Sequence, residues 1–486
     1  MSNAPQPAAS GLSGPEQPRL NWNFPKAFWV ANISELFERA AFYGMFIALS
    51  LYLTREVGFN DVETGWVIAC FSFLLYLMPP FLGTLADKIG FRIALILAFA
   101  ALSFGYALLG LYQLKVVAVL ALLCVAFGGA IVKPVILGTA AKCSDTLHRA
   151  RAFSIFYFMV NIGAFLGKSI AAPLRTGFDF PGLGRLEFGL VYINYYAAAM
   201  AFLALILVAV AYRSPDAASS GKSFNELMDG FLRVLSNGRF MVLIGIVAGF
   251  WLIQGQLYAS MPKYMIRLLG ESAKPEWLAN INPFVVVLCV MPITQLVRTM
   301  KPETSIGISL LIIPLSALTV SLAPILQGSV GNSVSIFGLF SLHPITLMVI
   351  IGIIFQGLAE CFLSPKFMEY ASHQAPKGEE GLYMGFQNLP VAISWLLGFI
   401  LSGYLLDAFC PDPEKLAKTD PDQYAQWQAA INGTAEMPTA FAHAHYIWYV
   451  FVGVGVTAFI ALMIYNRITR RIDSLAAAAS NSNQNR

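Results

Sequence analysis

Long apolar stretches separated by short polar segments dominate the chain. A helix that crosses a bilayer needs about 20 mainly apolar residues, and twelve stretches meet this requirement. The first six are 27–53, 64–85, 92–112, 116–141, 150–172 and 188–212. The second six are 239–260, 279–297, 303–325, 340–365, 382–407 and 441–465. The pattern predicts an all-α membrane protein with twelve transmembrane helices in two six-helix halves.

Polar segments mark the ends of the chain and its middle. Residues 1–26 are rich in Pro, Ser and Gly and lack the apolar core of a signal peptide, so we expect a disordered cytoplasmic tail there. A second cytoplasmic tail is expected at 467–486, and its end, SLAAAASNSNQNR, is expected to be disordered. Residues 213–238 contain the amphipathic stretch FNELMDGFLRVL. They are expected to form a cytoplasmic linker between an N-terminal half at 27–212 and a C-terminal half at 239–466.

The distribution of Lys and Arg predicts the orientation of the helices. With both termini inside, 19 of these residues fall in cytoplasmic segments and 9 in outer loops. Basic residues are enriched on the cytoplasmic side of membrane proteins. We therefore expect both termini in the cytoplasm and a place in a plasma membrane or a bacterial inner membrane.

Composition agrees with a lipid-exposed protein and argues against other classes. Hydrophobic residues make up 57% of the 486 and charged residues 12%, against about 25% charged in soluble domains. The six cysteines are scattered, so neither a disulfide framework nor a metal site is indicated. No set of nucleophile, base and acid suggests an enzyme, and the net charge of +4 does not require nucleic acid.

The most informative charges lie within the first span, in SELFERAAFYGM. Glu35, Glu38, Arg39 and Tyr43 are spaced so that they share one helical face. A charged side chain at the bilayer centre costs about 2.5–3.5 kcal/mol on insertion scales. These residues must therefore face a protein or water-filled interior and need partners there.

Two further spans carry charges at similar depth. Glu35 and Lys133 each lie about 12 Å from the cytoplasmic side, which permits an ion pair between the first and fourth spans. Glu360 adds an acid in the tenth span, whereas Lys168 near the outer end of the fifth could extend to the interface. A substrate carboxylate that binds Arg39 or Lys133 would favour protonation of a neighbouring glutamate. The alternative is a static clamp that holds the helices together.

The segment after the second span, GTLADKIGFR, resembles the loop signature of major facilitators. That resemblance implies a structural role for Gly83, Asp87 and Arg92, with the two charged residues clamping helix ends. Transporters of this kind carry their site between the two halves, near the membrane midplane.

Further motifs follow in order between about residues 30 and 400. Span 1 has ELFERAAFYG, and span 2 has Tyr76 and Pro79. Later spans carry GGAIVKPV, FSIFYFMVNIG, Asn282-Pro283 and ECFLSPKFMEYASHQAP. Together they resemble the signatures of the proton-dependent oligopeptide transporters, the peptide/nitrate branch of the major facilitators.

The resemblance implies a role for each matching residue. Proton coupling and binding of the substrate carboxylate are implied for Glu35, Glu38, Arg39 and Lys133. Glu360 would meet a peptide amino group and take part in gating. The remaining substrate-binding positions would be Tyr43, Tyr76, Tyr157, Asn161, Asn282 and Ser364.

Two positions depart from the family pattern. Phe46 stands where peptide transporters often have a basic or amide residue, and Gly255 stands where an acid is usual in the seventh span. We expect a symporter that uses protons, with no other cofactor, to import di- and tripeptides by alternating access. The departures leave room for another anionic or zwitterionic solute, such as an amino-acid conjugate, nitrate or a modified peptide. A non-transporting membrane sensor or binding protein is the alternative of another class.

Overall fold

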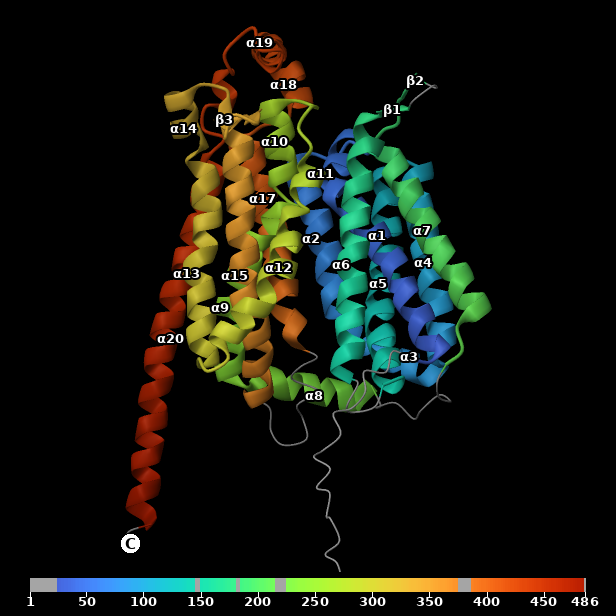
Figure 1. The fold of residues 1–486 in the computed structure, drawn as a ribbon, viewed down its shortest axis with the longest axis vertical. Helices are drawn as coiled ribbons and strands as arrows, with labels where there is room; N and C mark the ends of the chain where they lie inside the picture. The colour runs from blue at the N-terminus through green and yellow to red at the C-terminus, as the bar shows by residue number, and fades with distance from the viewer. Residues whose placement is uncertain (1–23, 145–148, 181–183, 215–223, 375–385, 485–486) are drawn as a thin grey trace, which may run out of the picture.

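Long apolar helices make up most of the chain, as the hydrophobic pattern predicts (Figure 1). The computed structural model describes residues 24–144, 149–180, 184–214, 224–374 and 386–484. Within these residues, eleven helices are long and apolar enough to cross a membrane singly. The bent pair α2 and α3 makes a twelfth span if it is counted as one.

The described part of the N-terminal half contains seven helices and one antiparallel hairpin. The helices are α1 (Lys26–Arg55), α2 (Asp61–Leu77), α3 (Pro79–Ile89), α4 (Phe91–Leu111), α5 (Lys115–Lys142), α6 (Arg149–Thr176) and α7 (Leu190–Ala211). The hairpin pairs β1 (Phe178–Phe180) with β2 (Gly184–Leu186). The chain bends by 50° between α2 and α3, where the consecutive prolines Pro79 and Pro80 lack the amide hydrogens that a continuous helix needs.

The C-terminal half follows the linker helix α8 (Phe224–Ser236). Its membrane-spanning helices are α9 (Gly238–Gln254) with α10 (Met261–Leu269), α12 (Ile281–Val297), α13 (Pro302–Ser321), α15 (Pro344–Gln374), α17 (Leu389–Phe409) and α20 (Tyr446–Gln484). Short elements connect them: η1 (Gly255–Leu257), α11 (Pro275–Leu278), α14 (Ala323–Val330), η2 (Phe386–Asn388), α18 (Pro413–Thr419), α19 (Pro421–Ile431) and η3 (Thr439–Phe441). A second hairpin pairs β3 (Val334–Ile336) with β4 (Phe340–Leu342). The predicted fold of two six-helix halves is confirmed.

The two ends of the bundle differ in what covers them (Figure 1). Helix α8 lies across one end, which we call the linker face, and α20 ends on the same side. The hairpins, α14, α18 and α19 project from the other end, which we call the loop face. The two faces give the molecule a polarity along the direction of its long helices.

Helices α2 and α17 form the closest seam between the halves, because glycines remove side chains from it. A Cβ atom on Gly65 would lie 2.5 Å from the carbonyl oxygen of Phe399. One on Gly403 would lie 2.6 Å from the carbonyl oxygen of Asp61. The backbones therefore approach each other as small residues allow in membrane bundles.

The expected disorder of the C-terminal end, 474–486, is not found in its described residues, because helix α20 continues to Gln484. The run of alanines after Leu475 has the highest helix propensity. It extends a helix that already exists, so no new nucleation is needed. The expected N-terminal tail lies largely outside the described residues, since these begin at residue 24.

The segment that resembles the loop signature of major facilitators is mostly helical. Gly83 and Asp87 belong to α3, and Gly90 turns the chain into α4 with φ +87°. Arg92 donates a hydrogen bond of 2.7 Å to the carbonyl of Ala209 near the end of α7, so one half of the expected clamp is present. Asp87 makes no ion pair with any described residue.

Candidate functional site

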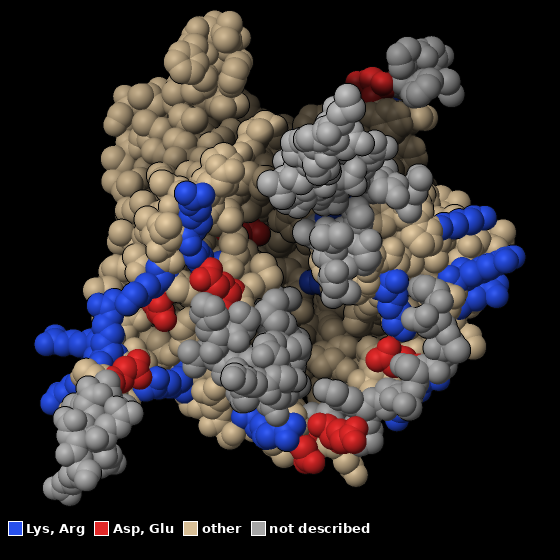
Figure 2. Space-filling view, turned by 60° about the horizontal axis from the view of Figure 1, so that its bottom comes forward, with Lys and Arg blue, Asp and Glu red and all other residues tan. Residues whose placement is uncertain are grey.

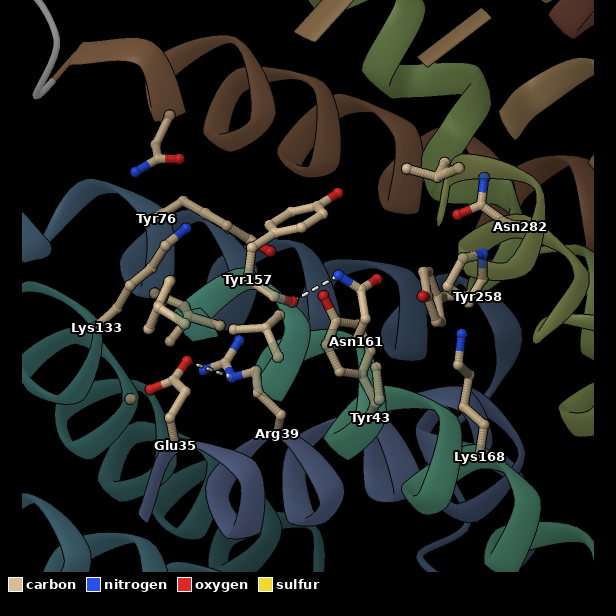
Figure 3. Close-up of a pocket in the computed structure, with 18 of the residues that line it drawn as sticks. Glu35, Arg39, Tyr43, Tyr76, Lys133, Tyr157, Asn161, Lys168, Tyr258 and Asn282 are labelled. Carbon is tan, nitrogen blue, oxygen red and sulfur yellow. Dashed lines mark hydrogen bonds and ion pairs between the residues drawn. The ribbon is translucent and has the colours of Figure 1, made fainter. Parts of the chain in front are cut away.

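A cavity of about 280 Å³ lies between the two halves (Figure 3). Both halves line it, through α1, α2, α5 and α6 on one side and α12, α15 and the chain around Tyr258 on the other. The space-filling view shows that the linker face is hollowed between the halves, with acidic and basic atoms visible in the recess (Figure 2). The hollow lies where the resemblance implies a transport site.

Helix α1 presents Glu35, Arg39 and Tyr43 to this cavity. Arg39 Nε lies 3.2 Å from Glu35 Oε1 and also forms an ion pair with Glu38. Its guanidinium lies 5.9 Å from the ring centroid of Tyr43. Glu38 is completely buried behind Arg39 and does not itself line the cavity. One arginine thus holds two buried carboxylates on the same helix.

Glycines on α6 bring that helix against the charged turn of α1. A Cβ atom on Gly163 would lie 2.7 Å from Arg39 Cβ, and one on Gly167 would lie 2.3 Å from the carbonyl oxygen of Ala40. The spacing of four residues aligns both glycines on one face of α6. This close packing limits the positions open to the Arg39 side chain.

Lys133 lines the same cavity from α5, but the expected ion pair with Glu35 is not formed. Glu35 is paired with Arg39 instead, four residues along its own helix. Among the described residues no carboxylate lies within ion-pair distance of Lys133. Equal depth therefore brought the two groups into one cavity without bringing them into contact, and the ammonium of Lys133 is left available.

The C-terminal half contributes Glu360, Asn282 and Tyr258 to the cavity. Glu360 Oε2 accepts hydrogen bonds from Gln254 Nε2 at 3.0 Å and from Asn282 Nδ2 at 3.4 Å. Both donors are neutral amides, so the charge of Glu360 is not cancelled by them. Glu360 is therefore an acid placed opposite the cations of the N-terminal half.

Most of the other expected site residues also line the cavity, namely Tyr43, Tyr76, Tyr157, Asn161 and Asn282. Ser364 does not, because it lies one helical turn, about 6 Å, beyond Glu360 on α15. Lys168 also differs from expectation. Instead of extending to the interface it is 1% exposed, lines the cavity and donates a hydrogen bond of 3.1 Å to the carbonyl of Ala279.

The two departures from the family pattern meet at one side chain, Trp395 of α17. Its ring stacks on Phe46 with centroids 5.2 Å apart and planes 9° apart. A Cβ atom on Gly255 would lie 3.2 Å from Trp395 Nε1, so a larger residue at 255 would have to displace the ring. Gly255, in place of an acid, leaves the space that the Trp395 ring occupies. Phe46 provides the aromatic surface on which that ring stacks.

Towards the loop face, buried ion pairs join the halves. Asp61, at the start of α2, accepts hydrogen bonds from Lys263 at 2.6 Å and from Arg267 at 2.9 and 3.0 Å. All three side chains are at most 4% exposed. The spacing of Lys263 and Arg267 on one face of α10 is the sequence signal for this cluster, although both residues lie outside the predicted spans 239–260 and 279–297.

A second cluster lies nearby. Arg175, at the end of α6, donates hydrogen bonds to Glu276 at 2.5 Å and to Glu271 at 2.6 Å. It also donates to the carbonyl of Ala273 at 2.6 Å. Arg55 of α1 pairs with Glu271 as well, at 2.5 Å. The two clusters hold the halves together on the loop face, while the opposite face is hollowed.

The described residues contain no group of three or more His, Cys, Asp or Glu side chains that could hold a metal ion. The lining residues supply carboxylates, ammonium groups, a guanidinium, amides and phenols to the cavity. These groups can bind charged ends of a small solute and can exchange protons.

Sequence comparison extends over most of the chain. Residues 32–338 match the family profile described as Major Facilitator Superfamily. Multidrug resistance protein MdtH of Blochmanniella pennsylvanica is 23% identical over 376 residues, which are 77% of this chain and 84% of that protein. Dipeptide and tripeptide permease B of Xenorhabdus bovienii is 28% identical over 182 residues, 35% of this chain and 37% of that protein.

Solved structures share the fold at low sequence identity. The POT family transporter PepTSo has a TM-score of 0.66 and 17% identity, and the match covers 92% of this chain and 99% of that chain. The nucleoside transporter NupG has a TM-score of 0.67 and 13% identity, covering 90% and 99%. At these identities the comparison establishes the fold alone, so the solute has to be inferred from the residues of the cavity.

Proposed function

The chain belongs to the major facilitator superfamily, and we propose that it is a proton-coupled symporter that imports di- and tripeptides by alternating access. One observation carries the proposal. Arg39 is held by two buried glutamates in a cavity between the halves, and the ammonium of Lys133 stands in the same cavity without a carboxylate partner among the described residues.

Arg39 and its two glutamates form the coupling unit. When a substrate carboxylate binds Arg39 and Lys133, the attraction between Arg39 and the glutamates weakens. A buried carboxylate that loses its cation favours the protonated form. One oxygen of Glu35 and one of Glu38 are buried and accept no hydrogen bond from any described residue, so either carboxylate has a free position for a proton. Binding of substrate and uptake of a proton thereby favour each other.

The remaining cavity residues provide the rest of the peptide site. The family resemblance assigns the peptide amino group to Glu360, which lies on the half opposite Arg39 and Lys133. A peptide bound by both its ends would then touch both halves. Tyr43, Tyr76, Tyr157, Asn161 and Asn282 offer hydroxyl and amide groups to its backbone.

The orientation follows from the positive-inside rule, which makes the linker face cytoplasmic. The loop face would then be external, and the ion pairs of Asp61 and Arg175 would close it. With the hollow on the linker face, this arrangement corresponds to the inward-facing state of an importer. Both ends of the described chain lie on the same side, since α1 begins and α20 ends there (Figure 1).

A second candidate has specific support. The extended likeness to a multidrug resistance protein and the aromatic contact at Phe46 and Trp395 favour a solute other than a short unmodified peptide. Amino-acid conjugates, nitrate and modified peptides are the alternatives that the same charges would accept. A sensor or binding protein would bind such a solute without moving it.

Reconstitution into liposomes tests the proposal. We expect an inward proton gradient to drive accumulation of labelled di-alanine, and a protonophore to abolish it. Uptake that ignores the gradient would remove the coupling. Failure of every tested peptide to accumulate, with accumulation of one of the other solutes, would favour the second candidate. If a solute binds but no solute is transported, the result would support a membrane sensor or binding protein instead.

A further inference from the structure

We propose that Lys168 forms a second anion-binding group of the cavity, and that the preferred solutes carry two carboxylates and one amino group, as acidic dipeptides do. The proposal rests on the proposed function because it takes the central cavity as the transport site. It goes further in assigning a role to Lys168 and in specifying the charge of the solute.

The position of Lys168 follows from the periodicity of α6. Tyr157, Asn161, Ala164 and Lys168 all line the cavity from this helix, at a spacing that keeps them on one face. Tyr157 and Lys168 are separated by about 16 Å along the helix axis. Lys133 and Arg39 lie near Tyr157, whereas Lys168 lies at the opposite end beside Tyr258 and Asn282 (Figure 3). The cavity therefore has cations at both ends.

The ammonium of Lys168 has little to balance its charge. The side chain is 1% exposed, and its Nζ donates to the carbonyl of Ala279 and lies 5.6 Å from the ring centroid of Tyr43. No carboxylate of the described residues is within ion-pair distance. A carbonyl accepts one of its three N–H groups, and a buried cation without an anion is costly. An anionic group of a solute would supply the negative charge that is missing beside the ammonium of Lys168.

None of the described groups around Lys168 forms an ion pair with it, so its ammonium remains available to bind an anion. Most of these groups carry no charge, namely the side chains of Tyr43 on α1, Asn282 on α12 and Tyr258, and the backbone carbonyl of Ala279. Glu360 on α15 is the carboxylate whose charge acts on Lys168. It is held by Gln254 and Asn282 instead. Because both of these donors are neutral amides, the negative charge of Glu360 remains available to the amino group of a solute. Lys168 remains available to a second carboxylate.

The charge balance of the cavity agrees with such a solute. Arg39, Lys133 and Lys168 carry three positive charges, against the carboxylates of Glu35 and Glu360 in the cavity and of Glu38 directly behind Arg39. One coupling proton on a glutamate leaves a net charge of +1. A dipeptide with one acidic side chain carries two carboxylates and one ammonium, and so brings a charge of −1. Di-alanine, which is neutral overall, leaves the protonated cavity with an uncompensated charge.

Matched ligands and variants test the role of Lys168 directly. The Kd of the purified full-length protein is measured for alanyl-glutamate and for alanyl-glutamine. The two ligands differ only in the side-chain carboxylate, which alanyl-glutamine replaces by a neutral amide of nearly equal shape. We expect alanyl-glutamate to bind about tenfold more tightly. We expect K168M to remove this preference, so that the two dipeptides bind K168M with equal affinity, and K168R to retain it. K274M, at an exposed lysine outside the cavity, is the control and should behave like the unchanged protein.

Equal affinity for the two dipeptides in the unchanged protein would overturn the proposal, as would a preference that survives in K168M. Should K168M fail to fold, the comparison of the two ligands on the unchanged protein still decides. The two proposals fail separately. If peptides are taken up in response to the gradient but substitution of Lys168 has no effect, the symporter proposal stands and the second anion site is contradicted. Lys168-dependent binding of glutarate, with no uptake of any peptide, leaves the anion site and removes the peptide function.

Discussion

Phe46 of α1 and Trp395 of α17 stack face to face across the boundary between the two halves, with their ring planes 9° apart. Tyr76 and Tyr258 also lie against the tryptophan, with ring centroids at 5.0 and 6.1 Å. The family resemblance places polar groups at 46 and 255. Here an aromatic cluster joins the halves beside the cavity, and it can separate without leaving a buried charge unpaired.

Removing the indole ring should weaken this junction. We expect W395A to lower the midpoint of thermal unfolding in detergent by several degrees, because truncating a buried aromatic side chain costs about 3–5 kcal/mol. The control is W66A, since Trp66 is 48% exposed on α2 and its loss opens no buried space. Equal midpoints for the two variants would contradict a role of Trp395 in joining the halves.

The coupling unit predicts separate effects on driven and exchange transport. E35Q should abolish accumulation driven by a proton gradient, because an amide cannot take up the proton. Counterflow exchange, which needs no net proton movement, should persist. E38Q should share this defect if the two carboxylates act as a unit on Arg39. The same change at the exposed Glu56, E56Q, is the control on the same stretch of chain. Gradient-driven uptake by E35Q at the normal rate would show that the proton is carried elsewhere.

The Asp61 cluster should favour the state that is closed on the loop face. D61N leaves Lys263 buried without a carboxylate among the described residues, and leaves Arg267 with only its 3.5 Å pair to Asp412. Loss of one partner of a buried pair costs about 3–5 kcal/mol. We expect the variant to spend more time open on the loop face, measured as faster labelling of a cysteine introduced beside the cavity by an impermeant reagent. D407N breaks an exposed pair with Lys415 and should change the labelling rate little. An unchanged rate in D61N would mean that the cluster does not control closure.

The seam between α2 and α17 predicts a steric effect that a single methyl group can reveal. In G65A the new Cβ would meet the carbonyl oxygen of Phe399 at 2.5 Å, so the two backbones must move apart. We expect lower thermal stability and slower transport. G245A, within α9, adds the same methyl group with nothing within 4 Å and should be neutral or slightly stabilising. If both substitutions have the same effect, the close approach at Gly65 is not needed.

Charges within apolar stretches identified much of the site without any structure. The cost of an ionised group in lipid requires Glu35, Arg39, Lys133 and Glu360 to face an interior, and all four line one cavity. The apolar stretches themselves determined the number and approximate extent of the spans. Both inferences rest on local properties of the chain, namely hydropathy and helical periodicity.

Tertiary packing decided which of these groups touch. Depth along a helix does not specify its neighbour, so Arg39 rather than Lys133 is the partner of Glu35. The path of α6 decided that Lys168 points into the cavity instead of towards the interface, and the approach of α10 to α2 decided the pairing of Asp61. Such contacts depend on the rotation and separation of whole helices, which arise from interactions between residues far apart in the chain.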